Sequence, residues 1–407
     1  MALPSVSVVV VSQGRPESLL WCLTALAGQV YAAFEVVVVA DPLACARVAQ
    51  SRFAGRVKLV SFEPPNIAAA RNRGVAVAAG EVIAFVDDDA AAEPLWLHRL
   101  VEGFALSGVK AVGGYVRGRN GISYQWRARQ VEAAGWASPL VAEGAAPFVP
   151  EVAAGCAVKT EGTNMAVRRD VLVALGGFDE AFHFYLDETE LNLRLAAARH
   201  KTALCPMAEV HHAYRASPRR KDDRTVRDLF DVGASTVVLQ RKTGQPVARA
   251  MARMRAEQTA RLAAQRRRGL MDTAGEQQVL QSLEAGFCAG VERPFGCYPA
   301  GLETPEAFLP FAPDRRENVT LAGRWRNRAA LRRRAGELAA QGRNVSLYLF
   351  SFDTRFHHLR FDMAGYWEQA GGQFGKAVRS APLVQLTSFD RRLKAEQDRV
   401  KHARGEV

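Results

Sequence analysis

The chain has 407 residues, 48% of them hydrophobic and 24% charged, which is the composition of a soluble globular protein large enough for two domains. Its longest apolar runs, 6–11 and 36–40, are far shorter than the roughly 20 residues that a membrane-spanning helix needs. The N-terminus lacks a basic segment followed by an apolar core and a cleavage site, so we expect a cytoplasmic location. Six cysteines with no CxxC pair among them indicate neither a zinc site nor a disulfide framework.

Essentially all of the net charge of +12 lies in the C-terminal part of the chain. Residues 1–217 contain 20 Lys and Arg against 21 Asp and Glu, a net charge of −1. Residues 218–407 contain 34 against 21, a net charge of +13. This asymmetry predicts two domains with a boundary near Ser217 and Pro218.

Apolar, strand-like segments alternate with helical segments over about the first 90 residues. Buried strands are expected at 5–11, 34–40, 57–62 and 82–86, and helices after 16 and at 44–53 and 66–79. This alternation predicts an α/β fold with a mostly parallel sheet flanked by helices. Ligands bind at the carboxyl ends of the strands in such sheets, and Ser12, Asp41 and Asp87 to Asp89 stand at those ends.

Three consecutive carboxylates, Asp87, Asp88 and Asp89, directly follow the strand expected at 82–86. Like charges at a strand end repel one another and are costly to desolvate, so a cation is expected beside them. A divalent ion that is held through oxygen ligands and bridged to phosphates meets this requirement. The alternative, which the triplet taken alone favours, is a solvated turn that caps the next helix.

A second acidic pair, Asp187 and Glu188, stands at the start of a predicted helix, one face of which is continued by Leu191, Leu195 and Ala198. Carboxylates at a helix start are stabilised by the helix dipole, so capping is the structural alternative to catalysis for this pair.

Taken in order along the chain, these segments resemble the family 2 glycosyltransferases, which are nucleotide-diphospho-sugar transferases with a GT-A fold. The resembling segments are 8–16 (VVVVSQGRP), 35–41 (EVVVVAD), 66–89 (NIAAARNRGVAVAAGEVIAFVDDD), 162–165 (GTNM), 176–180 (GGFDE) and 187–191 (DETEL). The resemblance covers about residues 5–217, and it implies a GT-A catalytic domain over 1–217. Two departures stand out: Ala40 replaces an expected acid, and the expected Glu-Asp pair is reversed as Asp187-Glu188.

The resemblance implies an inverting enzyme that moves a sugar from a nucleotide-diphosphate donor, typified by UDP-sugar, to a hydroxyl of a glycan or lipid-linked acceptor in cell-surface polysaccharide synthesis. A divalent metal, Mn²⁺ or Mg²⁺, is the implied cofactor, because it neutralises the leaving diphosphate as a Lewis acid. The implied nucleotide-sugar contacts are Ser12, Asp41, Arg71, Asp87 and Asp88, and the implied metal ligands are Asp89 and Asp87. A helix N-cap is the alternative role for Ser12, and a surface salt bridge is the alternative for Arg71.

His211 and His212 follow the last strand of the predicted catalytic domain. Imidazole can complete a Mn²⁺ shell, and the resemblance implies a histidine ligand here. His212 fits the spacing slightly better than His211, and an ordinary surface histidine is the alternative for both.

An inverting transferase needs a general base opposite the leaving group, since an acceptor hydroxyl is a poor nucleophile at neutral pH. The resemblance implies that the second acid of the pair, Glu188, is this base. Because the order of the two acids is reversed, Asp187 remains the alternative.

Residues 218–407 are expected to form a basic, mainly helical extension, with helices over 222–290 and one strand-like segment at 344–352. Arginines at 249–268 and 324–334 provide either a solvated helix face or a surface for peripheral contact with anionic lipids at the inner face of the cytoplasmic membrane, or with an anionic acceptor. No aromatic-interleaved or recognition motif accompanies them, so no nucleic-acid partner is expected.

Two other functions share parts of this pattern. A sugar nucleotidyltransferase has a related fold but requires a Gly-rich phosphate loop after the first strand, and 12–16 (SQGRP) is too short and too poor in glycine. A non-catalytic nucleotide- or polyanion-binding protein would not need both the triplet and the second acidic pair.

Overall fold

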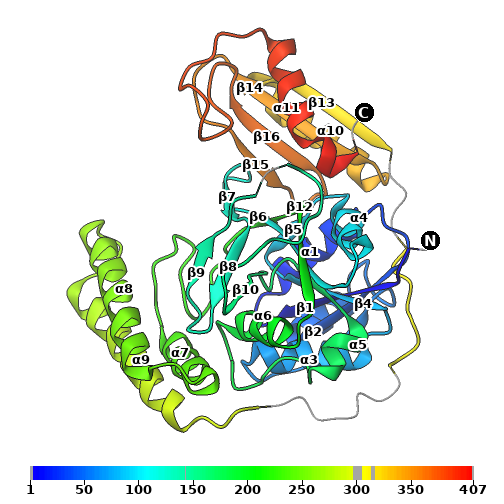
Figure 1. Ribbon diagram of the computed structural model, residues 1–407. Coiled ribbons are helices and arrows are strands. Elements are labelled where there is room, and N and C mark those ends of the chain that lie inside the picture. The colour runs from blue at the N-terminus through cyan, green and yellow to red at the C-terminus, as the bar shows by residue number, and fades with distance from the viewer. Residues whose placement is uncertain (1–2, 143, 297–304, 313–316, 406–407) are drawn as a thin grey trace.

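The computed structural model describes residues 3–142, 144–296, 305–312 and 317–405 (Figure 1). A large sheet flanked by helices forms the N-terminal part, three long helices lie beside it, and a smaller sheet with two helices lies at one end. Within the described residues, no helix has both the length and the apolarity needed to cross a bilayer. The cysteines in this part of the chain are free, namely Cys22, Cys45, Cys156, Cys205 and Cys288, and Cys297 lies outside it.

The N-terminal part is organised around a nine-stranded sheet of order β3-β2-β1-β4-β11-β6-β12-β5, with β7 paired to β6. Its strands are β1 (Val6–Ser12), β2 (Phe34–Ala40), β3 (Lys58–Ser61), β4 (Val82–Asp87), β5 (Ala90–Ala92), β6 (Val109–Arg117), β7 (Tyr124–Trp126), β11 (Met165–Arg168) and β12 (Lys201–His212). Strands β1, β2, β3, β4, β6 and β12 run in one direction, whereas β11, β5 and β7 run the other way. The predicted α/β fold with a mixed, mostly parallel sheet is confirmed.

Helices cover both faces of this sheet because its central strands are apolar on both sides. These helices are α1 (Pro16–Leu26), α2 (Pro42–Ala49), α3 (Ile67–Val77), α4 (Trp96–Val101), the 3-10 helix η1 (Glu102–Ala105), α5 (Arg169–Ala174) and α6 (Asp187–Ala197). Along β1, Val8 and Val10 are buried in one core with Leu19, while Val9 is buried in the other core with Val75. Side chains alternate along a strand, so an unbroken run of valines fills both cores.

The carboxyl ends of β1, β2 and β4 meet at one edge of the sheet. The strand register pairs Ser12 with Ala40 and Val11 with Asp87. Asp41 directly follows Ala40, so the acidic ends of β2 and β4 flank the end of β1. A small three-stranded sheet of β8 (Arg129–Glu132), β9 (Ala137–Pro139) and β10 (Cys156–Val158) packs against α6.

Three long helices, α7 (Phe230–Thr243), α8 (Val247–Arg267) and α9 (Thr273–Glu292), confirm the helical prediction for 222–290. Helices α7 and α9 pack so closely that a Cβ on Gly286 would lie 2.0 Å from the carbonyl oxygen of Phe230. Helix α7 also holds the group to the N-terminal part, because Ser235 Oγ donates a hydrogen bond to the Phe184 carbonyl at 2.8 Å. These three helices therefore lie against the segment that leads into α6.

The end of the chain forms a second, smaller α/β unit. Its elements are β13 (Asn318–Arg324), the 3-10 helix η2 (Trp325–Asn327), α10 (Arg328–Ala340), β14 (Asn344–Ser351), β15 (His358–Phe361), β16 (Trp367–Gly372) and α11 (Phe389–Arg404). The sheet order is β13-β14-β16-β15, and β13, β14 and β16 are parallel. Helices predominate in the C-terminal part as predicted, but of this sheet only β14 was expected.

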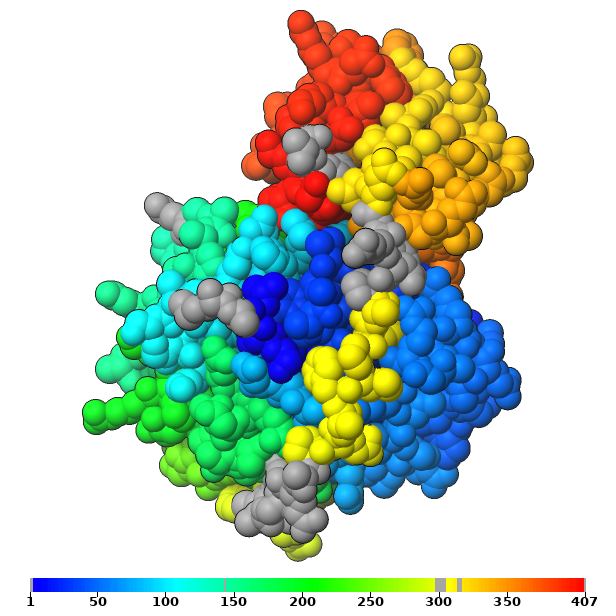
Figure 2. Space-filling model, turned by 90° about the vertical axis from the view of Figure 1, so that its right-hand side faces the viewer, coloured from blue at the N-terminus to red at the C-terminus, as the bar shows by residue number. Residues whose placement is uncertain are grey.

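Residues 305–312 lie across the surface of the N-terminal part, as the yellow segment in Figure 2 shows. The Phe311 ring packs against Phe34, with 5.3 Å between ring centroids, and against Phe53, with 6.2 Å. Phe311 also donates its backbone N–H to the Phe34 carbonyl at 2.9 Å. This segment therefore completes a core that the N-terminal part leaves open.

A buried ion pair joins the second unit to the N-terminal part. Arg404 of α11 is 3% exposed, and its Nε lies 3.0 Å from a carboxylate oxygen of Glu93. Arg404 Nη1 also donates to Ser346 Oγ at 3.0 Å, and His211 Nε2 lies 2.8 Å from Glu93. Burial alone raises the pKa of Glu93, but Arg404 and His211 hold it well below its usual range.

Replacing Arg404 by Met is expected to lower the free energy of unfolding by about 3 kcal/mol, because it leaves the Glu93 carboxylate buried without its main cation. The measurement is urea or thermal unfolding of the full chain. Arg391 lies exposed on the same helix, so Arg391→Met is the matched control and is expected to change stability by less than about 0.5 kcal/mol. Equal stability of the two variants would contradict the expected role of the pair.

Candidate functional site

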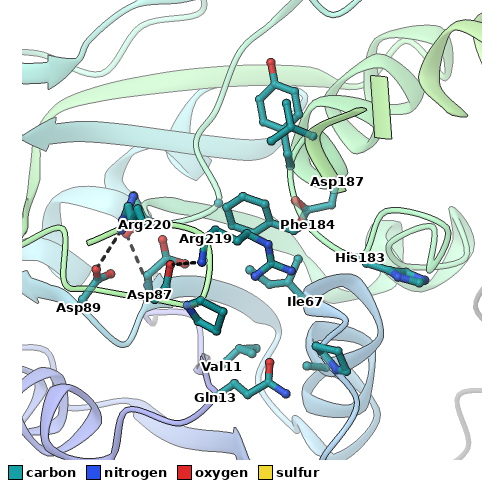
Figure 3. A pocket seen from close by; sticks show the side chains of 18 of the residues that line it. Val11, Gln13, Ile67, Asp87, Asp89, His183, Phe184, Asp187, Arg219 and Arg220 are labelled. Atoms are coloured by element: carbon teal, nitrogen blue, oxygen red, sulfur yellow. Dashed lines mark hydrogen bonds and ion pairs between the residues drawn. The ribbon is translucent and has the colours of Figure 1, made fainter. Parts of the chain in front are cut away.

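A cavity of about 500 Å³ opens at the carboxyl edge of the large sheet (Figure 3). Seven of the residues predicted for the site line it: Ser12, Arg71, Asp87, Asp89, Asp187, Glu188 and His212. The other three predicted residues, Asp41, Asp88 and His211, are not part of its lining. Helix α8 also reaches the cavity, through Gln258 and Arg261. Both predicted acidic groups therefore face one space.

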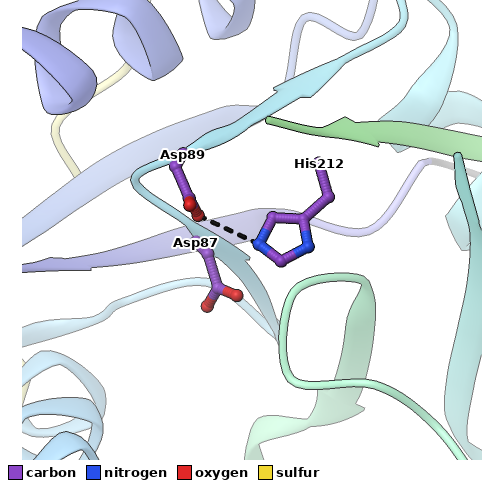
Figure 4. Close-up of side chains that lie close together, drawn as sticks. All are labelled: Asp87, Asp89 and His212. Carbon is purple, nitrogen blue, oxygen red and sulfur yellow. Dashed lines mark hydrogen bonds and ion pairs between the residues drawn. The ribbon is translucent and has the colours of Figure 1, made fainter. Parts of the chain in front are cut away.

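Asp87, Asp89 and His212 form a group that can hold a metal ion (Figure 4). One ligand atom from each residue lies within 4.8 Å of the others, and His212 Nε2 is 3.1 Å from Asp89 Oδ1. His212 Nδ1 lies 3.1 Å from Gln125 Oε1, an acceptor that would keep the ring proton on Nδ1 and leave Nε2 free to ligate a metal ion. Two carboxylates and a neutral imidazole form a donor set that suits Mn²⁺.

His211 lies outside this group, although it is the neighbour of His212 in β12. Successive side chains point to opposite sides of a strand, so His211 points toward Glu93 and packs against the Trp367 ring, 4.7 Å away between centroids. His211 therefore takes part in the junction with the C-terminal unit.

Asp88 is fully buried and paired rather than solvated, which excludes the solvated-turn alternative for the triplet. It accepts a 2.6 Å hydrogen bond from Ser12 Oγ and forms an ion pair with Arg15. Burial raises the pKa of Asp88 to about 7, even though Arg15 opposes this shift. Arg15, rather than Ser12, occupies the N-cap position of α1.

Arg15 is a residue of the site that the sequence analysis did not identify. Its guanidinium pairs with Asp88 and lies 3.4 Å from Asp89, and it lines the cavity. A cation was expected beside the three aspartates, and Arg15, in the loop after β1, supplies one positive charge there. Its signal was a single arginine three residues after the end of β1.

Asp41 positions a loop at the edge of the site. Its side chain caps α2 by accepting from the Ala44 N–H at 3.1 Å, and it also accepts from the Gly14 N–H at 2.7 Å. It therefore holds the segment between β1 and α1, which carries Ser12 and Arg15.

Arg71 links the two acidic groups. It is 4% exposed, so the surface salt-bridge alternative is wrong. Its guanidinium forms an ion pair with Asp187, lies 3.4 Å from Asp87 and donates to the Gly162 carbonyl at 3.1 Å. A Cβ on Gly162 would lie 2.5 Å from Arg71 Nη2, so glycine is needed for this approach.

Asp187 and Glu188 begin α6, after Tyr185 and Leu186, which both have left-handed backbone conformations with φ of 72° and 68°. Such conformations are strained for these residue types and concentrate at functional sites. Burial and the neighbouring Glu188 raise the pKa of Asp187 to about 7, against the effect of Arg71. Of the two acids, Asp187 is therefore the one whose pKa is raised.

The pKa of Glu188 is displaced in the opposite direction from that of Asp187. Burial alone raises its pKa, but Lys159, whose Nζ lies 2.6 Å from Glu188 Oε1, outweighs burial and lowers the pKa to about 2. Lys159 was not identified from the sequence, because it lies in an irregular segment that carries no periodic signal. The pKa values of the two neighbouring carboxyl groups are thus displaced in opposite directions.

Comparison with known proteins finds a matching family model and several relatives. The family model described as glycosyltransferase like family 2 matches residues 4–230. The chain is 30% identical over 237 residues to the O-antigen biosynthesis protein RfbC of Myxococcus xanthus, covering 53% of this chain and 18% of that protein. It is 31% identical over 185 residues to a glucosyl-dolichyl phosphate glucuronosyltransferase of Haloferax volcanii, covering 43% of this chain and 55% of that one.

Among solved structures, the chain is similar to GalNAc-T7 in a structure with UDP, GalNAc and Mn²⁺. The TM-score is 0.46 and the identity 16%, over 59% of this chain and 48% of that one. The chain spans less than two thirds of each relative named above. The family model covers more than half of the chain and includes all the residues of the predicted site. The chain therefore belongs to the glycosyltransferase family 2, and its catalytic part has the GT-A fold.

Proposed function

We propose that this glycosyltransferase is a metal-dependent, inverting enzyme that uses a nucleotide-diphosphate sugar donor, with UDP-sugar as the preferred candidate. It moves the sugar to a hydroxyl of a glycan or lipid-linked acceptor in cell-surface polysaccharide synthesis. The observation that carries this proposal is that a metal-ligating group and a carboxylate pair face one cavity and are joined by Arg71. The names of the Myxococcus and Haloferax relatives support an acceptor of this kind. The nucleotidyltransferase and non-catalytic alternatives are set aside.

Asp87, Asp89 and His212 are the residues that would hold the metal. A divalent ion bound there supplies Lewis-acid stabilisation for the negative charge of the departing diphosphate. Gln125 orients His212 through Nδ1, and Arg15 shares the remaining charge of Asp89. Ser12 lines the cavity beside them, while the nucleotide contacts proposed for Asp41 and Asp88 would act through the loop that these two residues position.

Asp187 is the residue that we propose as the general base, in place of Glu188, which the resemblance implied. Base catalysis is most efficient when the pKa of the base lies near the working pH, and the pKa of Asp187 is about 7. Glu188 is held as a carboxylate by Lys159, and its negative charge keeps the pKa of Asp187 raised. Arg71 fixes the direction of the Asp187 carboxylate.

Contact with an anionic membrane surface stays a prediction. On α8, several arginines are partly neutralised by glutamates: Arg253 lies 2.9 Å from Glu257, Arg255 lies 2.6 Å from Glu284, and Arg266 lies 2.5 Å from Glu276. In the second basic segment, Arg332 lies 2.6 Å from Glu368. Less free charge is therefore available on these faces than the sequence count suggests.

Calorimetric titration of UDP, GDP and CDP, each with and without Mn²⁺, tests the proposed function. We expect UDP to bind most tightly, with an affinity that falls at least about tenfold when Mn²⁺ is removed, since the ion bridges carboxylates and diphosphate. Nucleotide binding that is independent of metal, or no nucleotide binding, would contradict the proposal.

A further inference from the structure

The segment that follows His212 folds back over the cavity. Ser217 and Arg220 exchange backbone hydrogen bonds at 2.9 and 3.1 Å, and the segment is bounded by Tyr214 and Arg224, both with left-handed backbone conformations (φ 56° and 71°). These residue types rarely adopt positive φ, so the surrounding contacts must hold the segment in this shape. Its side chains Arg219 and Arg220 reach the cavity, as Figure 3 shows.

Three guanidinium groups gather here from two different elements. Arg220 lies over the Tyr214 ring at 5.3 Å and Arg224 lies over the same ring at 3.8 Å. Arg261 lies on α8 and lines the cavity together with Arg220. The positive charges of Arg220 and Arg224 act on it. The Arg261 side chain is exposed at the rim of the cavity, and partial desolvation there, together with Arg220 and Arg224, lowers its pKa. Like charges are thus held together at the rim of the site.

Few ion pairs neutralise this group: within the described residues none is formed by Arg224 or Arg261, although Asp222 and Asp223 directly precede Arg224 in the chain. Arg220 Nη2 lies 3.5 Å from Asp89, which is also a residue of the metal-ligating group. Arg261 hydrogen-bonds weakly to Gln258, at 3.4 Å, and in the described part of the chain no carboxylate forms an ion pair with it. Of the other five α8 arginines, those at 253, 255 and 266 each have a glutamate partner, whereas no ion pair is formed within the described residues by those at 249 and 267. Arg261 is the α8 arginine that lines the cavity.

An anion offsets the repulsion among three guanidiniums, and phosphate oxygens match the donor geometry of arginine. Arg261 extends this positive charge away from the carboxylates of β4. The cavity lining around α8 also contains Val226, Leu229 and Val232, which are apolar. This combination suits a phosphate that is attached to an apolar chain or to a nucleoside.

We propose that Arg220, Arg224 and Arg261 form a binding site for a phosphate group of a substrate, so that α8 of the helical extension takes part in the active site. The inference rests on the proposed function and extends it. The phosphate belongs either to the donor diphosphate or to a phosphate-bearing acceptor, and the two sources are separable by experiment.

Arg261→Gln and Arg249→Gln form a matched pair of variants for the test. Both arginines are exposed and both variants remove one positive charge from α8, but only Arg261 is part of the cavity lining. Each variant and the unmodified chain are titrated with UDP and Mn²⁺, with inorganic pyrophosphate in EDTA, and with farnesyl phosphate and farnesol in EDTA. We expect Arg261→Gln to weaken pyrophosphate binding about tenfold and Arg249→Gln to leave it unchanged within about twofold.

The other probes identify the source of the phosphate. If Arg261→Gln weakens UDP and Mn²⁺ binding but not farnesyl phosphate binding, the site holds the donor diphosphate. If it weakens farnesyl phosphate binding while farnesol does not bind, the site holds an acceptor phosphate. Equal affinities of both variants for every phosphate probe, with normal metal-dependent UDP binding, would overturn this inference and leave the proposed function intact. Loss of metal-dependent UDP binding in the unmodified chain would overturn the proposed function instead.

Discussion

Asp187→Asn is expected to lower kcat by about three orders of magnitude, which is within the range for the loss of a general base. The affinity for UDP and Mn²⁺ should change by less than about threefold, because Asp187 contacts the metal-ligating group only through Arg71. Glu188→Gln should reduce kcat less, by about tenfold, since it removes a neighbouring charge rather than the base. The measurements are steady-state kinetics with a UDP-sugar and calorimetry with UDP.

The pH dependence of kcat/KM separates the two carboxylates. A base acts only when deprotonated, so activity should fall as the pH drops below about 7, the pKa of Asp187. The charge of Glu188 raises that pKa, so in Glu188→Gln the acidic limb should move to lower pH. If Glu188→Gln is instead the inactive variant, and Asp187→Asn keeps a normal pH profile, then the base is Glu188, as its position in the motif implied.

Asp89→Asn is expected to weaken Mn²⁺ binding at least about 100-fold and to lower kcat/KM by about three orders of magnitude. Asp89 shares its charge among His212, Arg15 and Arg220, and an amide in its place supplies no negative charge to a cation. The measurement is Mn²⁺ titration followed by electron paramagnetic resonance, with activity assayed at saturating metal.

The two adjacent histidines provide a matched control for the metal-ligating group. His212→Asn should lose Mn²⁺ affinity, whereas His211→Asn should keep it within about threefold, because His211 faces Glu93 on the other side of β12. The His211 variant should instead lower the melting temperature, since it removes a hydrogen bond from a buried carboxylate. Equal loss of Mn²⁺ affinity in both variants would contradict the assignment of His212.

The fold of the N-terminal part was predictable because its central strands are buried on both faces and therefore appear as unbroken apolar runs. Three strands of the C-terminal sheet were not predicted, since β13 and β15 mix polar and apolar residues and β16 ends in Ala370, Gly371 and Gly372. Their burial depends on the helices and the N-terminal part packed around them. No local pattern contains that information.

The residues of the candidate site likewise fall into those that the sequence predicts and those that it does not. Asp87 and His212 are the last residues of β4 and β12, and Asp89 lies two residues after Asp87, so topology brings them together, and the order of the chain is enough to indicate them. Arg15 and Lys159 were missed because each acts through a partner far away in the sequence. The choice between Asp187 and Glu188 likewise depends on which cation lies beside each carboxylate, and only three-dimensional structure supplies it.

The contacts between the C-terminal unit and the N-terminal part affect how the chain folds during synthesis. The hydrogen bond from Trp21 Nε1 to the Phe361 carbonyl joins residues 340 positions apart, and that between Arg404 and Glu93 joins residues 311 apart. Contacts between residues so far apart in sequence form late, because the loop-closure entropy of the intervening chain opposes them. Until residues 305–405 are synthesised, Trp21 of α1 and the Phe34 and Phe53 side chains that Phe311 packs against therefore lack these contacts. These surfaces are where a chain halted before residue 305 would associate or be recognised by chaperones.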